Sequence, residues 1–254
     1  MMPDTKWRVI QLTEHDAALN MALDEAVCRA ISRGASPPTI RFYTWSPSAV
    51  SIGYFQEIER EVDINYCTQN GINFVRRRTG GGAVYHDSKG ELTYSVLAPE
   101  NMFPKDIIAS YKIICNWIIE GLAGVGIHAE FKPINDIVTS GRKISGNAQT
   151  RRDGILQQHG TILYGLDAET MFRCLKVPDT KIRDKMIQSA KERVTSIREL
   201  TGDSVSFDAL YASVLDAFCA GKEFSFGTFT QEELADAYWL AKSKYSSRDW
   251  NFWR

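Results

Sequence analysis

Residues 74–87 read FVRRRTGGGAVYHD and join three arginines directly to three glycines between two segments of strand character. Glycine lets backbone N–H groups approach an anion closely, and adjacent guanidinium groups supply positive charge and forked donors. The stretch is not a P-loop, since it lacks a GKS or GKT ending, nor a dinucleotide fingerprint, since its glycines are contiguous. It predicts an anion cradle built into a sheet. The alternative is a structural turn with an exposed basic flank.

The segments around this stretch predict further strands. Residues 39–55 read as two strands joined in a hairpin. Residues 91–97 alternate apolar and polar side chains, which predicts a strand with one buried face. Residues 129–164 predict a meander of four strands whose tight turns fall at 140–141 and 153–154, where Ser-Gly and Asp-Gly stand.

Helical periodicity marks most of the remaining chain. We expect helices at about 16–33, 105–123, 168–176, 179–190, 206–220 and 230–244. Strands and helices together predict an α+β fold, a mainly antiparallel mixed sheet with packed helices. Residues 1–254 are predicted to form a single domain in which about 205–254 are a helical C-terminal portion.

Composition narrows the function classes. The formal net charge of −1 argues against a nucleic-acid partner, because general nucleic-acid binders are strongly basic. The five cysteines are far apart and form no CxxC pair, which fits a reducing cytoplasm better than a disulfide framework or a zinc site. The N-terminus lacks signal-peptide character, and the apolar region 107–127 is interrupted by polar residues. We expect a soluble cytoplasmic protein without membrane association.

Two later segments could also carry chemistry. Residues 141–149, GRKISGNAQ, place Lys143 among small residues, which would let its ammonium group meet a ligand at close range. The pair His159-Gly160 falls on the next predicted strand. Taken alone, each has an ordinary explanation, as a solvated hairpin lysine and as a structural histidine. No Ser-His-Asp or Cys-His arrangement can be read from the sequence.

In combination, these motifs resemble the lipoate-protein ligase family. RRRTGGGAVYHD is followed, in the family's order and at similar spacing, by INDIV, GRKISGNAQ, QHGTILYG and RVTSI, and the resemblance extends to SIGYFQ at 51–56. It covers nearly the whole chain and implies the catalytic fold that this family shares with biotin-protein ligases.

The resemblance implies an AMP-forming ligase with ATP and magnesium as cofactors and lipoate as substrate. Such an enzyme makes lipoyl-AMP and passes the lipoyl group to a carrier lysine. By this resemblance, Lys143 is the catalytic residue and Asp136 is a ligand of a magnesium ion held mainly through phosphates. The implied adenylate contacts are Arg77, Gly82, Ala83, Val84, Tyr85, Asn135, Asp136 and Lys143. The implied lipoate contacts are Gly81, His86, Lys143, Gly146, His159 and Gly160.

The implied partners are lipoyl domains of 2-oxoacid dehydrogenase components or the glycine-cleavage carrier protein. Self-sufficient ligases carry a further C-terminal domain after the catalytic one. The resemblance implies that residues 1–254 are a single ligase catalytic domain with no separate C-terminal accessory domain, and therefore that a separate accessory subunit exists.

Two alternatives stay open. Octanoyl and lipoyl transferases of the same fold act without ATP through a cysteine thioester, but this chain has no cysteine between Cys115 and Cys174, where those enzymes carry theirs. The other alternative is a noncatalytic lipoyl-binding relative.

Overall fold

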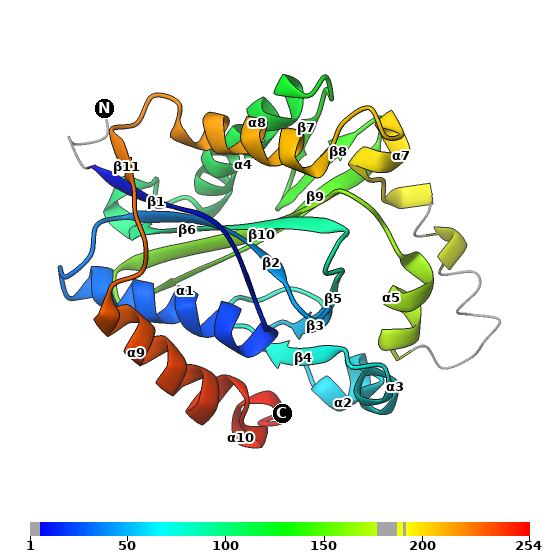
Figure 1. Ribbon diagram of the computed structural model, residues 1–254, viewed down its shortest axis with the longest axis horizontal. Coiled ribbons are helices and arrows are strands. Elements are labelled where there is room, and N and C mark those ends of the chain that lie inside the picture. The colour runs from blue at the N-terminus through cyan, green and yellow to red at the C-terminus, as the bar shows by residue number, and fades with distance from the viewer. Residues whose placement is uncertain (1–5, 177–186, 190–191) are drawn as a thin grey trace.

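The computed structural model describes residues 6–176, 187–189 and 192–254. Its centre is an eight-stranded mixed sheet in the order β11-β1-β2-β6-β10-β9-β8-β7 (Figure 1). β1 pairs in parallel with β2 and β11, and the other neighbours are antiparallel. The strands are β1 (Trp7–His15), β2 (Thr39–Trp45), β6 (Glu91–Pro99), β7 (Glu130–Lys132), β8 (Asp136–Thr139), β9 (Arg142–Arg152), β10 (Ile155–Leu163) and β11 (Phe224–Phe226).

A smaller sheet in the order β4-β3-β5 stands beside it, formed by β3 (Ala49–Ile52), β4 (Asn73–Arg76) and β5 (Val84–His86). The hairpin predicted for residues 39–55 is therefore wrong, because β2 and β3 belong to different sheets. β2 lies between β1 and β6 and has no free edge on which β3 could pair. The turn after β2 instead carries the chain from one sheet to the other.

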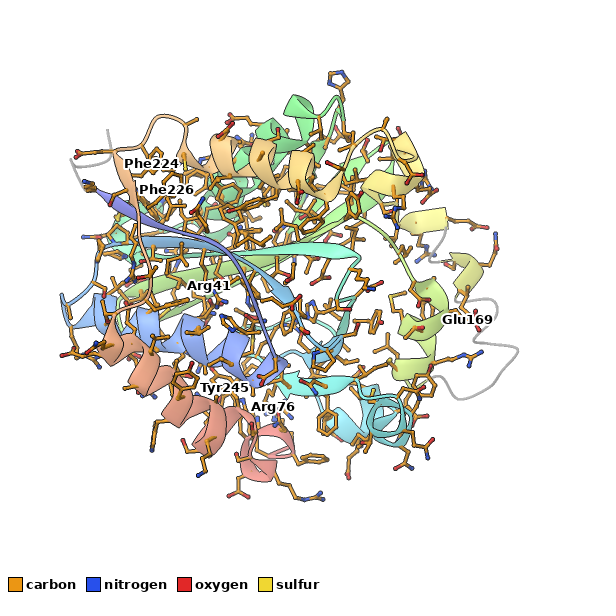
Figure 2. The ribbon with its side chains drawn as sticks, viewed as in Figure 1. Arg41, Arg76, Glu169, Phe224, Phe226 and Tyr245 are labelled. Carbon is orange, nitrogen blue, oxygen red and sulfur yellow. The ribbon has the colours of Figure 1, made fainter. Side chains whose placement is uncertain are left out.

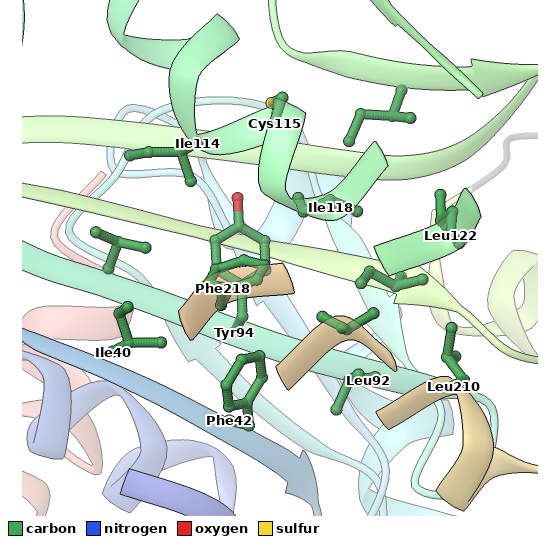
Figure 3. Close-up of a cluster of buried hydrophobic side chains, with 14 of the residues drawn as sticks. Ile40, Phe42, Leu92, Tyr94, Ile114, Cys115, Ile118, Leu122, Leu210 and Phe218 are labelled. Carbon is green, nitrogen blue, oxygen red and sulfur yellow. The ribbon is translucent and has the colours of Figure 1, made fainter. Parts of the chain in front are cut away.

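Helices cover both faces of the large sheet. α4 (Ile107–Gly124) and α8 (Phe207–Cys219) lie on one face, and α1 (Ala17–Ser32) and α9 (Gln231–Leu240) lie on the other (Figure 1). On the first face, the ring of Phe218 packs against those of Phe42 and Tyr94 (Figure 3). Its centroid lies 5.2 Å from that of Phe42 and 5.1 Å from that of Tyr94. By length and composition alone α4 could span a membrane, but Ile114, Ile118 and Leu122 on its buried stripe belong to this core.

The strand predicted to have one buried face is buried on both. Residues 91–98 of β6 are all buried, including the polar Thr93 and Ser95. α1 packs over the polar face, where the hydroxyl of Ser95 donates to Asp24 Oδ2 at 2.6 Å. Alternation in this strand therefore separates an apolar core from a buried polar layer.

Arg41 on β2 is the centre of that polar layer. Its guanidinium donates to Asp24 Oδ1 at 2.9 Å and to Asn20 Oδ1 at 2.8 Å, and both side chains of the ion pair are fully buried. Arg41 also lies over the ring of Tyr43 at 4.0 Å. Figure 2 shows Arg41 in the interior, between α1 and the sheet. A buried ion pair thus joins α1 to the central strands.

The remaining elements complete an α+β fold with a large mixed sheet, as predicted. They are α2 (Ile58–Glu61), α3 (Ile64–Gln69), a 3-10 turn (Glu100–Met102), α5 (Ala168–Cys174), α7 (Ile197–Thr201), a π-helical turn (Ala241–Tyr245) and α10 (Arg248–Asn251). Both predicted tight turns have two residues of positive φ, at 140–141 and 153–154. The helix expected at 179–190 lies outside the described residues except for 187–189, which are helical.

Candidate active site

A cavity of about 320 Å³ opens where the two sheets meet. This volume lies within the range of small-molecule sites, roughly 300–1,000 Å³. Strands β5, β6, β9 and β10 line it together with the glycine run and α5. The residues that the sequence had singled out for a site line this cavity, with the exception of Asp136: Arg77, Gly81, Gly82, Ala83, Val84, Tyr85, His86, Asn135, Lys143, Gly146, His159 and Gly160.

Lys143 and Asp136 form an ion pair at the β8–β9 hairpin. Lys143 Nζ lies 2.7 Å from Asp136 Oδ1, and the two side chains are 39% and 34% exposed. A Cβ atom at Gly146 would stand 2.7 Å from that Nζ, so the absence of a side chain at 146 makes room for the lysine. Within the described part of the chain, no three His, Cys, Asp or Glu side chains gather as a metal site. The carboxylate of Asp136 is therefore paired with the ammonium group of Lys143.

Arg77 holds the glycine run in shape. Its side chain is buried, and Nη2 donates to the carbonyl oxygens of Gly80 and Gly82, each at 2.8 Å. Nε donates to Thr79 Oγ1 at 3.1 Å, and Nη1 donates to Ser51 O and Oγ at 3.2 and 3.1 Å. A guanidinium has five N–H groups, and here five acceptors of the protein take them. No N–H of Arg77 is left for a nucleotide phosphate.

The neighbouring arginines are also buried, so the alternative of an exposed basic flank does not hold. Arg76 donates to the carbonyl oxygens of Tyr54, Trp250 and Asn251, which ties α10 to the segment after β3. Figure 2 shows Arg76 close to the C-terminal helices. Arg78 lies 3.9 Å from Glu25 of α1. The arginine run therefore joins three separate parts of the chain.

Gly53 packs closely against the backbone of the glycine run. A Cβ atom at Gly53 would stand 2.0 Å from the carbonyl oxygen of Gly81, which is backbone and cannot swing aside. We predict that Gly53→Ala lowers the unfolding free energy by about 1–3 kcal/mol, as overpacking does, and also reduces activity because the cavity wall moves. Denaturant unfolding checks the first effect. Gly80→Ala is the matched control for stability, because its Cβ would meet nothing within 4 Å. Equal stability of the two variants would contradict the prediction.

Two histidines line the cavity, and each bonds a hydroxyl. His86 Nε2 lies 2.8 Å from Ser51 Oγ, and His86 Nδ1 lies 2.6 Å from Glu91 Oε1. The ring of His86 stacks on Trp45, with centroids 3.9 Å apart and planes at 15°. The other histidine, His159, has its Nε2 2.7 Å from Thr79 Oγ1. Burial lowers the pKa of His159.

Sequence reasoning missed Ser51 and Glu91 as site residues. The partners of the hydrogen-bonded chain Ser51–His86–Glu91 come from β3, β5 and β6, so no local spacing reveals them. The sequence contained one signal for Glu91, because it stands two residues before Thr93 and so falls on the same polar face of the strand. In the structure Thr93 Oγ1 donates to Glu91 Oε1 at 2.9 Å.

The five cysteines, all within the described residues, are buried and unbridged. None of them lines the cavity. Burial raises the pKa of Cys28 and of Cys115 to about 12, so both thiols stay protonated at neutral pH. These cysteines are packing residues of the core.

Comparisons with known proteins agree on a family. The family model described as Lipoyl protein ligase A/B catalytic domain matches residues 16–219. Among curated proteins, Octanoyltransferase LipM of Geobacillus kaustophilus is 38% identical over 98% of both chains. Octanoyltransferase LipM of Bacillus subtilis is 34% identical over the full length of both.

Solved structures are also similar. A bi-partite lipoate protein ligase from Thermoplasma acidophilum, solved as part of a lipoylation system with its E2 lipoyl domain, superposes with a TM-score of 0.87 at 33% identity, covering 98% of this chain and 96% of the other. A lipoate-protein ligase A bound with ATP gives 0.82 at 31% identity, covering 97% and 98%.

The relatives correct the expected reaction. Curated proteins that match along nearly the whole chain, among them those of Geobacillus kaustophilus, Brevibacillus brevis and Bacillus subtilis, are named octanoyltransferases. The prediction of an AMP-forming lipoate ligase with ATP and magnesium is therefore wrong, and the alternative of acyl transfer without ATP fits better. The engaged N–H groups of Arg77 and the pairing of Asp136 with Lys143 agree with that correction.

The motifs from the glycine run to RVTSI meet around one cavity, where Thr195 N donates to Lys143 O at 2.8 Å. The fold, the matched family model and the full-length relatives all agree with the resemblance read from those motifs. The chain belongs to the lipoyl protein ligase A/B catalytic domain family.

Proposed function

We propose that this protein transfers an octanoyl group, or the related lipoyl group, from a thioester donor to a lysine of a lipoyl domain, without ATP. The observation that carries the proposal is the composition of the cavity wall. Met21, Leu163 and Met171 offer apolar surface for a medium-length acyl chain, while Lys143 supplies a positive charge on the same wall. The names of the full-length relatives support the same reaction class.

The chemistry needs what this site contains. Attack on a thioester carbonyl places negative charge on the carbonyl oxygen, and a preorganised cation stabilises that charge. Lys143, held by Asp136, would supply it. The apolar part of the cavity would exclude water, which protects the activated acyl group from hydrolysis.

The proposed acceptors are lipoyl domains of 2-oxoacid dehydrogenase components or the glycine-cleavage carrier protein. The Thermoplasma relative was solved in a system with an E2 lipoyl domain, which supports this choice. A cytoplasmic location fits the five unbridged cysteines. An accessory subunit was implied by adenylation, and stays a prediction from resemblance alone.

Purified protein, octanoylated acyl carrier protein and an apo lipoyl domain, mixed without nucleotide, test the proposal. Intact-mass spectrometry of the lipoyl domain should show the addition of one octanoyl group. A lipoyl domain whose acceptor lysine is replaced by arginine is the matched control and should stay unmodified. An unmodified wild-type acceptor would overturn the proposal, and tight binding of the acyl group without transfer would instead indicate the noncatalytic relative.

A further inference from the structure

We propose that Ser51 is the nucleophile that carries the acyl group as an ester between donor and acceptor, with His86 as its base. The inference rests on the proposed transferase function and adds the covalent step. Ser51 stands on the cavity wall at the end of a continuous hydrogen-bonded chain, Ser51–His86–Glu91. Such a chain, a hydroxyl, an imidazole and a carboxylate in order, is the general device that activates a serine.

The proposal assigns one direction of proton transfer along this chain. In this assignment Glu91 Oε1 accepts the N–H of His86 Nδ1, from which it lies 2.6 Å away. His86 Nε2 then accepts from the Ser51 hydroxyl, whose oxygen lies 2.8 Å away. Stacking on Trp45 holds the plane of the ring. The arrangement is poised to accept the serine proton.

Arg77 adds a positive charge at the same oxygen. Its Nη1 donates to Ser51 Oγ at 3.1 Å, and its side chain is 4% exposed. Burial lowers the pKa of Arg77 to about 10, so the guanidinium remains charged at neutral pH. A buried cation that donates to a hydroxyl oxygen favours the alkoxide over the alcohol. Base and cation therefore act together on Ser51.

The other candidate nucleophiles fit less well. Thr79 bonds His159 at 2.7 Å, but the Thr79 side chain is fully buried and does not line the cavity. Its relay is also incomplete, because His159 Nδ1 and Asp24 Oδ2 are 3.7 Å apart, which exceeds hydrogen-bond length. The five cysteines do not reach the cavity. Among these residues, Ser51 alone both lines the cavity and has an oriented base, although it is only 2% exposed.

The proposed reaction has two halves, acylation of Ser51 and transfer to the acceptor lysine. Ser51 Oγ attacks the thioester carbonyl carbon, the C–S bond breaks, and the serine proton passes through His86 to the leaving thiolate. The amine of the acceptor lysine then attacks the Ser51 ester, the C–O bond breaks, and an amine proton returns through His86 to the serine oxygen. The products are a thiol, an amide and unchanged enzyme. Glu91 is a positioning residue that sets the imidazole tautomer.

The test is a trapping experiment followed by a full transfer assay with the same protein. Wild-type protein is incubated with octanoylated acyl carrier protein alone, and the modified residue is located by peptide mass spectrometry. We expect one octanoyl ester on the peptide that contains Ser51. Ser51→Ala should lose the adduct and slow transfer to the lipoyl domain by at least about a hundredfold. Ser110→Ala, a buried hydrogen-bonded serine on α4 outside the cavity, should behave like wild type.

Two further variants keep the proposal falsifiable if Ser51→Ala fails to fold. Ser51→Cys should still form the adduct, now as a thioester that neutral hydroxylamine cleaves readily. Glu91→Gln should favour the wrong imidazole tautomer and slow adduct formation by about a thousandfold or more, with KM for the donor little changed. A merely structural role for Glu91 would instead alter folding or KM.

The outcomes separate this inference from the proposed function. Transfer by wild type with equal transfer by Ser51→Ala, or an adduct on a cysteine, overturns the inference and leaves the transferase function intact. An adduct on Ser51 without any transfer to a lipoyl domain supports the nucleophile and overturns the proposed acceptor. The absence of both adduct and transfer overturns both.

Discussion

Replacement of Lys143 by alanine is expected to slow acyl transfer to a lipoyl domain by at least about a hundredfold, because it removes a preorganised charge from the site of the developing oxyanion. The fold should survive, because the side chain is 39% exposed and its ion-pair partner Asp136 is 34% exposed. Exposed pairs of this kind contribute about 1 kcal/mol or less to stability. The steady-state rate and the thermal midpoint measure the two effects.

Lys132 provides the matched control for that variant. It is exposed on the neighbouring strand β7 and does not line the cavity. Lys132→Ala should therefore keep the wild-type rate. A Lys143→Ala protein that is as fast as Lys132→Ala would remove Lys143 from the mechanism.

Replacement of Arg41 by alanine is expected to lower the unfolding free energy by about 3–5 kcal/mol, because it strands the Asp24 carboxylate in the interior. Both side chains of the pair are fully buried. Burial by itself acts to raise the pKa of Asp24, but Arg41, followed by His159, lowers it, and the net direction is downward. In wild type this ionised carboxylate therefore stabilises the fold above its unfolded pKa, and the contribution is lost as the pH falls through the lower folded pKa.

Denaturant unfolding at two pH values checks this expectation. Without Arg41, burial raises the pKa of Asp24 above its unfolded value, so acidification neutralises the unpaired carboxyl group. The difference in unfolding free energy between wild type and Arg41→Ala should therefore become smaller at the lower pH. Arg60→Ala removes a surface pair with Glu57, whose side chains are 78% and 46% exposed, and is the control. It should change the free energy by about 1 kcal/mol or less. If Arg41→Ala loses no more unfolding free energy than Arg60→Ala, the buried Arg41–Asp24 pair does not stabilise the fold as proposed.

The parts of the fold that were predictable are those set by local chemistry. The Ser140-Gly141 and Asp153-Gly154 turns were recognisable because they require residues that tolerate positive φ, and both occur as predicted. The capping box of Thr230 and Glu233 likewise marks the start of α9 in the sequence and in the structure. The division into two sheets was not predictable, because it depends on β6, rather than β3, pairing with the second edge of β2.

In the candidate site, too, only features set by local sequence were predictable. Contiguous motifs pointed to the glycine run, to Lys143 and to His159, and those residues meet at one cavity. The sequence did not indicate that the N–H groups of Arg77 donate to the protein's own backbone and side chains. Acceptors such as Gly82 O and Ser51 O can be identified only in the structure. Neither a serine nor a cysteine nucleophile could be read from the sequence, because Ser51, His86 and Glu91 lie on three different strands that meet only in the folded protein.

The reaction type was the larger error, and its cause is physical. A ligase and a transferase both hold a medium-length acyl chain and both stabilise charge at its carbonyl, so motifs that serve those tasks do not distinguish the two. What distinguishes them is the source of activation, a nucleotide or a thioester. In this chain the buried arginine and the paired aspartate serve the protein's own loops and lysine.

The nucleotide dependence of the transfer rate distinguishes a thioester-driven transferase from an ATP-dependent ligase. Octanoylated acyl carrier protein, an apo lipoyl domain and the purified protein are mixed after treatment with apyrase and EDTA, and the initial rate of lipoyl-domain octanoylation is compared with that in the presence of ATP and magnesium. Equal initial rates are expected in the two mixtures. Octanoylation that begins only when ATP and magnesium are supplied would contradict the proposed transferase function.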